Sequence, residues 1–289
     1  MSILDVAILA IVQGLAELLP VSSSAHVVVA EKLLGLDPSS PPMTLLLVML
    51  HTGTMFAVIV YFWRQWRGAY FSSGPAFKAI AIRLILATVV TALVGEIIIK
   101  IIEKTVLRDV PHSQIEDLFS HLEFIAPALA AAGILIVIAG LRGRASGGGS
   151  SGSAAGGELG MRDAGLIGMV QGLCLPFRGF SRSGATISTG MLLGVDKPRA
   201  ERFSFALAVL LTPPVVLREA WRLAHAPPVA ATLTSVALES LLGAALAFVA
   251  GLVALRWLSR WLESGRWHLF GVYCLIAAVA VALLHRAGY

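Results

Sequence analysis

The sequence predicts an all-α integral membrane protein with six transmembrane helices and two re-entrant helix–loop–helix pairs in inverted-topology repeats. First, the 289 residues are 57% hydrophobic and only 13% charged, with a mean hydropathy of +0.84. Soluble domains carry about 25% charged residues, so most of this surface is expected to face lipid. Second, six apolar stretches are long enough to cross a bilayer. Third, one short polar segment occurs twice, each time inside apolar sequence.

The six predicted transmembrane helices come from stretches of about 20 apolar residues, the length that spans the hydrocarbon core. They are residues 42–63, 79–101, 122–141, 203–221, 232–255 and 267–285.

Two further apolar pairs are interrupted. Residues 3–19 and 26–36 flank the first polar segment, and residues 161–175 and 183–195 flank the second. Each piece is too short to cross alone, so each pair is predicted to enter the bilayer and return. Irregular backbone at this depth is tolerated only where protein surrounds it.

The chain is predicted to form a single membrane domain, 1–289, made of repeat one (1–142) and repeat two (161–289). Residues 146–157 are almost entirely Gly, Ser and Ala, which is typical of a flexible linker, whether native or artificially inserted. Each repeat holds three spans, an odd number, so the second repeat is predicted to be inverted relative to the first.

The basic residues indicate membrane topology rather than binding to nucleic acid. Thirteen of the 22 Lys and Arg residues lie in the loops 64–83, 142–164, 195–203 and 256–266, and seven lie on the opposite side. Loops rich in Lys and Arg face the cytoplasm. The two cysteines lie in apolar segments, which argues against a disulfide framework.

The first polar segment combines a carboxylate, hydroxyls and an imidazole. Gln13 and Glu17 are four residues apart and share a helical face, and Pro20 ends that helix. His26 follows Ser23 by three residues, so the two can meet on one face. The hydroxyls able to cap the next short helix are Ser22, Ser23 and Ser24.

The second segment repeats this plan with arginines. Pro176 ends one helix, and Ser181 or Ser183 is expected to open the next. The two short-helix N-termini are predicted to meet near the bilayer centre and to favour an anion there. Arg182 adds a bidentate partner suited to phosphate.

Energetics exclude a lipid-facing position for these charges. Glu17, Arg178 and Arg182 exposed to lipid would together cost about 8–10 kcal/mol, at about 2.5–3.5 kcal/mol each. They must therefore face each other or a wet cavity, either as a functional site or as an ion pair that joins the repeats. His51, early in a predicted span, either packs between helices or lines that cavity.

The two segments resemble the signatures of the bacterial undecaprenyl-diphosphate phosphatases. The likeness rests on residues 13–26 and 179–186, and it continues in Val60-Tyr61-Phe62-Trp63-Arg64 and Glu201-Arg202-Phe203-Ser204-Phe205. The resemblance implies a multi-pass protein of the bacterial inner membrane whose pocket opens to the periplasm. Its expected activity is removal of the terminal phosphate of a C55 polyprenyl diphosphate, which recycles the lipid carrier for cell-wall synthesis and confers bacitracin resistance. A divalent cation, Mg or Ca, is the expected cofactor.

Residue by residue, the resemblance assigns roles to both segments. Glu17 matches the essential glutamate and metal ligand, Ser23 the nucleophile, His26 the motif histidine and Arg182 the phosphate-binding arginine. Expected substrate-binding residues are Gln13, Ser22, Ser24, Ser181, Ser183, Thr186 and Arg178. This sequence departs from the family pattern at Ala16, Ala25 and Arg178-Gly179.

Several alternatives stay open at this level. Ser23 either attacks phosphorus or positions a water, with His26 expected to take and return the proton. A polyprenyl-phosphate transporter or flippase is the rival function, since inverted repeats with broken helices are transporter architecture. A phosphatidic acid phosphatase of type 2 is disfavoured, because its other motifs are missing from the sequence. A homodimer stays open as the assembly.

Overall fold

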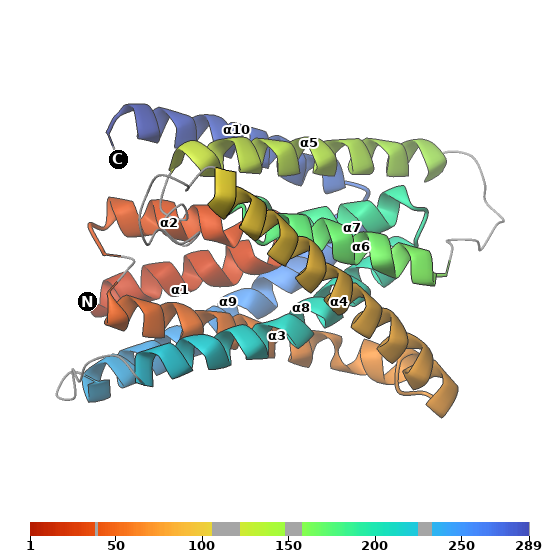
Figure 1. Ribbon diagram of the computed structural model, residues 1–289, viewed down its shortest axis with the longest axis horizontal. Helices are drawn as coiled ribbons and strands as arrows, with labels where there is room; N and C mark the ends of the chain where they lie inside the picture. Colours follow the sequence, from red (N-terminus) through yellow and green to blue (C-terminus); the bar gives the residue numbers. More distant parts are fainter. Residues whose placement is uncertain (38–39, 106–121, 148–157, 225–232, 289) are drawn as a thin grey trace. The chain divides into compact units, whose positions relative to one another are not determined.

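The computed structural model describes residues 1–37, 40–105, 122–147, 158–224 and 233–288, and these residues form ten helices (Figure 1). The first five are α1 (Ile3–Leu18), α2 (Ser23–Leu33), α3 (Pro41–Ala69), α4 (Gly74–Thr105) and α5 (Leu122–Gly147). The last five are α6 (Met161–Cys174), α7 (Arg182–Leu192), α8 (Lys197–Ala224), α9 (Leu233–Glu263) and α10 (Trp267–Arg286). The short–short–long–long–long order therefore occurs twice.

Six helices within the described residues are long and apolar enough to span a membrane: α3, α4, α5, α8, α9 and α10. The longest of the other four, α1, has 16 residues and is about 24 Å long, short of a hydrocarbon core of about 30 Å. The prediction of an all-helical protein with six candidate membrane spans is confirmed, and the re-entrant course of the two short helix pairs stays a prediction. The predicted linker begins inside the last turn of α5, and its residues 148–157 lie outside the described residues.

The outer surface of the spans is apolar, as lipid contact requires. In the most apolar 18-residue window of α4, only 17% of the residues are buried. Its exposed side chains recur at helical spacing and include Ile82, Ile85, Val89, Leu93 and Ile97. A stripe of this kind on a soluble protein would be an aggregation site, whereas in a bilayer it contacts acyl chains.

The helices are grouped into two compact units. Unit 1 contains Met1–Leu19, Ser23–Trp63 and Ala208–Leu258, and unit 2 contains Pro20–Ser22, Arg64–Leu207 and Ser259–Tyr289. Each unit has helix–helix contacts of its own.

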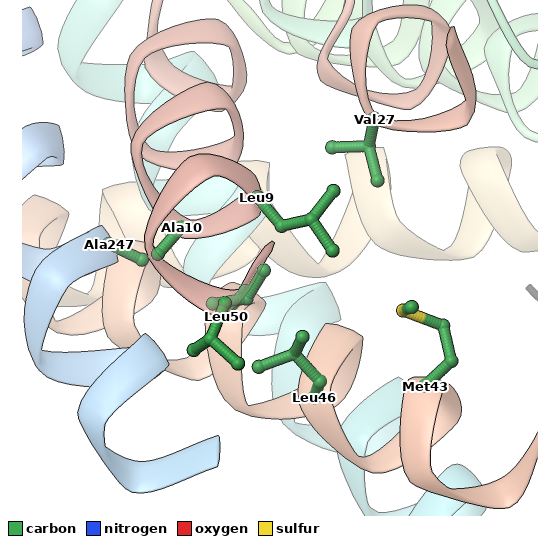
Figure 2. Close-up of a cluster of buried hydrophobic side chains, with 8 residues drawn as sticks. Leu9, Ala10, Val27, Met43, Leu46, Leu50 and Ala247 are labelled. Atoms are coloured by element: carbon green, nitrogen blue, oxygen red, sulfur yellow. The ribbon is translucent and has the colours of Figure 1, made fainter. Parts of the chain in front are cut away.

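The core of unit 1 fixes α1 against α2, α3 and α9. Its buried side chains are Val6, Leu9, Ala10, Val27, Met43, Leu46, Leu50 and Ala247 (Figure 2). Gly14 permits the close approach of α1 to α9, because a Cβ there would lie 2.8 Å from the carbonyl oxygen of Ala247. The C-terminal end of α1 is therefore held between neighbours.

Unit 2 is organised around two close helix pairs. Helices α5 and α10 lie side by side, and Gly133 faces Gly271 between them. Helix α6 packs on α4, where Thr91 Oγ1 donates to the carbonyl oxygen of Gly168 at 2.9 Å. The short helix α7 packs against both α5 and α6, so α7 is held on two sides.

Candidate active site

The first polar segment forms a tight break between α1 and α2. Helix α1 ends at Leu18, Leu19 is extended, and α2 begins at Ser23. Ser22 has a φ of +69°, the only left-handed non-glycine residue in the described part of the chain. A serine held in this region costs free energy, and such strain is often found at functional sites. The break turns the chain so that α2 packs against α1.

Glu17 is the centre of the polar contacts in this segment. Its Oε2 accepts a hydrogen bond from Gln13 Nε2 at 3.2 Å and one from Ser23 Oγ at 2.5 Å. The Gln13 side chain comes from the preceding turn of α1 and is 1% exposed. The structure therefore brings together three of the residues that the sequence predicted, and it aims the Ser23 hydroxyl at a carboxylate.

His51 of α3 completes this cluster. Its Nε2 lies 3.8 Å from Glu17 Oε2, and its Nδ1 lies 2.8 Å from the carbonyl oxygen of Leu47, one helical turn earlier. The sequence left His51 open between packing and cavity lining, and the structure places its Nε2 beside Glu17. The signal was available in the sequence, since an ionisable residue inside a transmembrane span is a candidate site residue.

The other predicted residues of the first segment are sequence neighbours of Ser23. His26 and Ser24 lie in the first turn of α2 and are partly exposed, whereas Ser22 is buried in the break. His26 is thus on the same short helix as Ser23. The contact described for the Ser23 hydroxyl is made with Glu17 rather than with His26.

The second segment forms an equivalent break between α6 and α7. Ser181 is the N-cap of α7, and its Oγ accepts a hydrogen bond from the backbone N–H of Gly184 at 3.2 Å. This decides between the two predicted caps, Ser181 and Ser183. Gly179 has a φ of +100°, and a Cβ there would lie 2.5 Å from the carbonyl oxygen of Ile125. Only glycine fits this turn.

Two arginines flank the N-terminus of α7. Arg182 is the first residue of α7, Arg178 lies in the turn before it, and both are partly buried. Arg182 therefore stands beside the backbone N–H groups that a helix leaves unpaired at its start. Ser183 follows in the same turn and is also partly buried.

Thr186 is bound within the protein. It is fully buried, its Oγ1 donates to the carbonyl oxygen of Arg182 at 2.8 Å, and it lies 2.5 Å from Ser204 Oγ of α8. These contacts tie α7 to α8 and hold the arginine-bearing turn. The Thr186 hydroxyl therefore stabilises the turn that carries Arg182.

The sequence predicts a divalent cation, with Glu17 as its ligand. Among the described residues, no group of three or more His, Cys, Asp and Glu side chains could hold a metal ion. Mg²⁺ typically keeps several waters and binds through one or two carboxylates plus substrate phosphates. The Glu17 carboxylate is a ligand of that class.

Comparisons with known proteins cover nearly the whole chain. A model of the family described as bacitracin resistance protein BacA matches residues 6–280, which include both breaks. The chain is 53% identical to undecaprenyl-diphosphatase 2 of Acinetobacter baylyi, over 98% of each protein. It is 36% identical to the undecaprenyl-diphosphatase of an Anaeromyxobacter species, over 98% of this chain and 88% of the relative. A third relative, the undecaprenyl-diphosphatase of Desulfosudis oleivorans, is 33% identical over 93% of each protein.

Proposed function

The chain belongs to the BacA family of bacitracin resistance proteins, and we propose that it is an undecaprenyl-diphosphatase, a membrane enzyme that converts undecaprenyl diphosphate to the monophosphate. The observation that carries this proposal is the 53% identity to undecaprenyl-diphosphatase 2 of Acinetobacter baylyi over 98% of both proteins. The Ser23–Glu17 contact supports a hydrolytic reaction, because it couples a nucleophile to a proton acceptor.

The test is phosphate release by protein purified in detergent and supplied with undecaprenyl diphosphate. The wild-type protein should release one phosphate per lipid, and a chelator should abolish the release if a divalent cation takes part. The rival transporter or flippase would move the intact lipid between vesicle leaflets and release no phosphate. Lipid movement without hydrolysis would overturn the proposal.

Ser23 is the proposed nucleophile and Glu17 the proposed proton acceptor. As Ser23 Oγ bonds to the terminal phosphorus, the bond from phosphorus to the bridging oxygen breaks, and undecaprenyl monophosphate leaves. The serine proton passes to Glu17 Oε2, with which the hydroxyl is already hydrogen-bonded at 2.5 Å. This contact favours Glu17 over His26 as the first acceptor. Phosphoserine trapped at Ser23 by acid quench supports this route, whereas full activity of Ser23→Ala eliminates it.

The remaining groups are proposed to hold the phosphates. Glu17 would bind a divalent cation together with substrate oxygens, and the bound cation would neutralise phosphate charge. Arg182 and the first N–H groups of α7 are suited to bind a phosphate anion. Ser181 supports this turn as its cap.

The two halves are proposed to be inverted repeats. Within unit 1, the first helix of the first half packs on α9 at Gly14. Within unit 2, the first helix of the second half packs on α4, where a Cβ at Gly172 would lie 2.8 Å from the carbonyl oxygen of Thr91. Helix α1 of the first half therefore contacts α9, the fourth helix of the second half, and α6 contacts α4, the fourth helix of the first half. Two equivalent halves related by a two-fold axis make reciprocal contacts of this kind. Three spans per half make the relationship an inversion.

The loop charges support an orientation with the loops 64–83, 142–164, 195–203 and 256–266 in the cytoplasm. Single cysteines introduced at Ser72 and at Asp37, after replacement of Cys174 and Cys274, test this proposal. Membrane-impermeant maleimide applied to intact cells should label the Asp37 site and spare the Ser72 site. The reverse pattern would overturn the orientation.

A further inference from the structure

Gln171 in α6 is a buried glutamine whose side-chain amide makes no hydrogen bond. The residue is 0% exposed, and neither Nε2 nor Oε1 has a hydrogen-bond partner within the residues that the structure describes. An amide buried in this way destabilises a fold, because both atoms are removed from water without a hydrogen bond in return. Beside a candidate active site, such a residue is better explained by binding than by folding.

Gln171 corresponds to Gln13 in the first half of the chain. Both begin the tripeptide Gln-Gly-Leu, at residues 13–15 and 171–173. The glycine after each glutamine meets a neighbouring helix at the same distance, with 2.8 Å between an added Cβ and a backbone oxygen. In the first half, Gln13 Nε2 donates to Glu17 Oε2 at 3.2 Å. The first break therefore pairs this amide with an oxyanion.

The second break has no oxyanion at the equivalent position. The residue four positions after Gln171 is Leu175, where the first segment has Glu17. Leu175 is 44% exposed, and its apolar side chain cannot accept a hydrogen bond. The second half therefore keeps the amide donor of the first half without the carboxylate that accepts from it. An anion bound at the break can supply the acceptor.

Gln171 also lies close to the place where an anion is favoured. One turn earlier on α6, the Cδ1 of Ile167 lies 3.6 Å from a Cβ added to Gly190 of α7. The two helices pack on each other, and the chain reverses between them, so later positions of α6 face earlier positions of α7. Gln171 is thus one turn nearer than Ile167 to the N-terminus of α7, where Arg182 stands.

We propose that Gln171 is a further substrate-binding residue, whose Nε2 donates to a phosphate oxygen of the diphosphate held at Arg182. This inference rests on the proposed function. The phosphate oxygen takes the place in the second break that the Glu17 carboxylate holds in the first. The amide turns toward the break to make this contact, because neither of its atoms is exposed in the structure.

The first experiment measures stability and activity together in Gln171→Leu. Leucine replaces the amide with an apolar side chain of similar size, so the thermal unfolding temperature in detergent should equal or exceed that of wild type. The kcat/KM for undecaprenyl diphosphate should fall about 10- to 100-fold, the effect of losing one hydrogen bond to a charged group. The loss should appear in KM, with kcat within about threefold, because the contact is present before and during transfer. A lower unfolding temperature with wild-type kcat/KM would show a structural role and overturn the proposal.

The second experiment measures binding without turnover. The probes are undecaprenyl methylene bisphosphonate, which keeps the phosphate charges but cannot be hydrolysed, and undecaprenol, which has the lipid tail alone. Gln171→Leu should bind the bisphosphonate about 10- to 100-fold more weakly than wild type and undecaprenol equally well. Equal weakening for both lipids would mean that the substitution disturbs the tail site or the fold, and it would overturn the proposal.

Ser240→Ala in α9 is the matched control. Ser240 is also 0% exposed, and its Oγ likewise has no hydrogen-bond partner in the described part of the chain. Its replacement should leave kcat/KM and both affinities at the wild-type values. A loss comparable to that of Gln171→Leu would show that any change to a buried polar group impairs the protein, and it would overturn the proposal.

The outcomes distinguish this proposal from the proposed function. Absence of phosphate release by the wild-type protein would reject the function itself. Wild-type phosphate release combined with unchanged kcat/KM in Gln171→Leu would reject only the role of Gln171.

Discussion

Ser23 donates its hydroxyl hydrogen to Glu17 Oε2 at 2.5 Å across the break that separates α1 from α2. The carboxylate occupies the last full turn of one short helix, and the hydroxyl opens the next. Gln13 donates to the same oxygen and fixes its position. The break therefore assembles a nucleophile, an acceptor and an orienting amide within one short segment.

Replacement of Glu17 by Gln should abolish turnover while leaving the fold intact. The amide has the shape of the carboxylate and can still accept a hydrogen bond, but it cannot accept the proton of Ser23. We expect kcat to fall on the order of 1000-fold, with little change in the thermal unfolding temperature. Phosphate release measures the effect, and Glu123→Gln is the control because Glu123 also lies 3.8 Å from a histidine nitrogen. Near-wild-type turnover in Glu17→Gln would show that Glu17 does not accept the proton of Ser23.

Ser22 should tolerate glycine and reject valine. Its φ of +69° is disfavoured for residues with a Cβ and most of all for β-branched ones. Ser22→Val should lower the free energy of unfolding by about 1–3 kcal/mol, and Ser22→Gly should maintain or raise stability. Thermal unfolding of both variants in one detergent tests this expectation. A valine variant as stable as wild type would show that the turn is not constrained in this way.

A side chain added at Gly14, where α1 approaches α9, should destabilise the protein about as much as one added at Gly172, where α6 approaches α4. Gly14→Val and Gly172→Val each place a Cβ about as close to a neighbouring backbone oxygen, 2.8 Å in both cases. We expect each to cost about 1–3 kcal/mol of stability through overpacking. Gly68→Ala in α3 is the control, since nothing lies within 4 Å of its added Cβ. Unequal losses at the two sites would argue against equivalent halves.

Thr186 and Ser204 should be energetically coupled. Their hydroxyls lie 2.5 Å apart in the interior, so Thr186→Val and Ser204→Ala should each destabilise unit 2. A double-mutant cycle should return a coupling free energy of about 1 kcal/mol. If Thr186 instead bound substrate directly, Thr186→Val would lower kcat/KM far more than Ser204→Ala does.

The start of α1 should lose stability at acid pH. The hydroxyl of Ser2 and its backbone N–H, which donates to Asp5 Oδ2 at 2.8 Å, hold the pKa of Asp5 below its usual value. A carboxyl group with a depressed pKa in the folded state stabilises it above the unfolded pKa, near 3.8, and this contribution is lost as the pH falls through the folded value. Ser2→Ala should raise the pKa of Asp5, which an NMR titration of its carboxyl carbon would detect. An unchanged pKa would show that the Ser2 hydroxyl does not lower the pKa of Asp5.

Much of the helical organisation was predictable because prolines and apolar length are local signals. Pro20 and Pro176 mark the two breaks. Helices α1 and α6 lie within their predicted apolar stretches, whereas α2 and α7 begin before theirs, at Ser23 and Arg182. The helix ends were less predictable. Helix α3 continues to Ala69, past Arg64 and Arg67, because long basic side chains bury their stems and extend their charges to the membrane surface.

The sequence identified most residues of the candidate site, but it did not show which of their side chains contact each other. Gln13, Glu17 and Ser23 follow from spacing across a proline, whereas His51 joins them only because α3 packs against α1. Similarly, Thr186 was expected to bind substrate because it matches a hydroxyl position of the family motif, and its contact with Ser204 depends on how α8 crosses α7. The sharing of one diphosphate by both breaks stays a prediction from the sequence.

The tether between Glu17 and Ser23 has a consequence for how a bulky lipid is admitted. Only five residues separate the two side chains along the chain, and the helices that bear them pack on each other. The distance between the carboxylate and the hydroxyl is therefore set within one short segment of the chain. The acid and the alcohol thus form a local pair whose geometry is separate from the surfaces that contact the lipid tail.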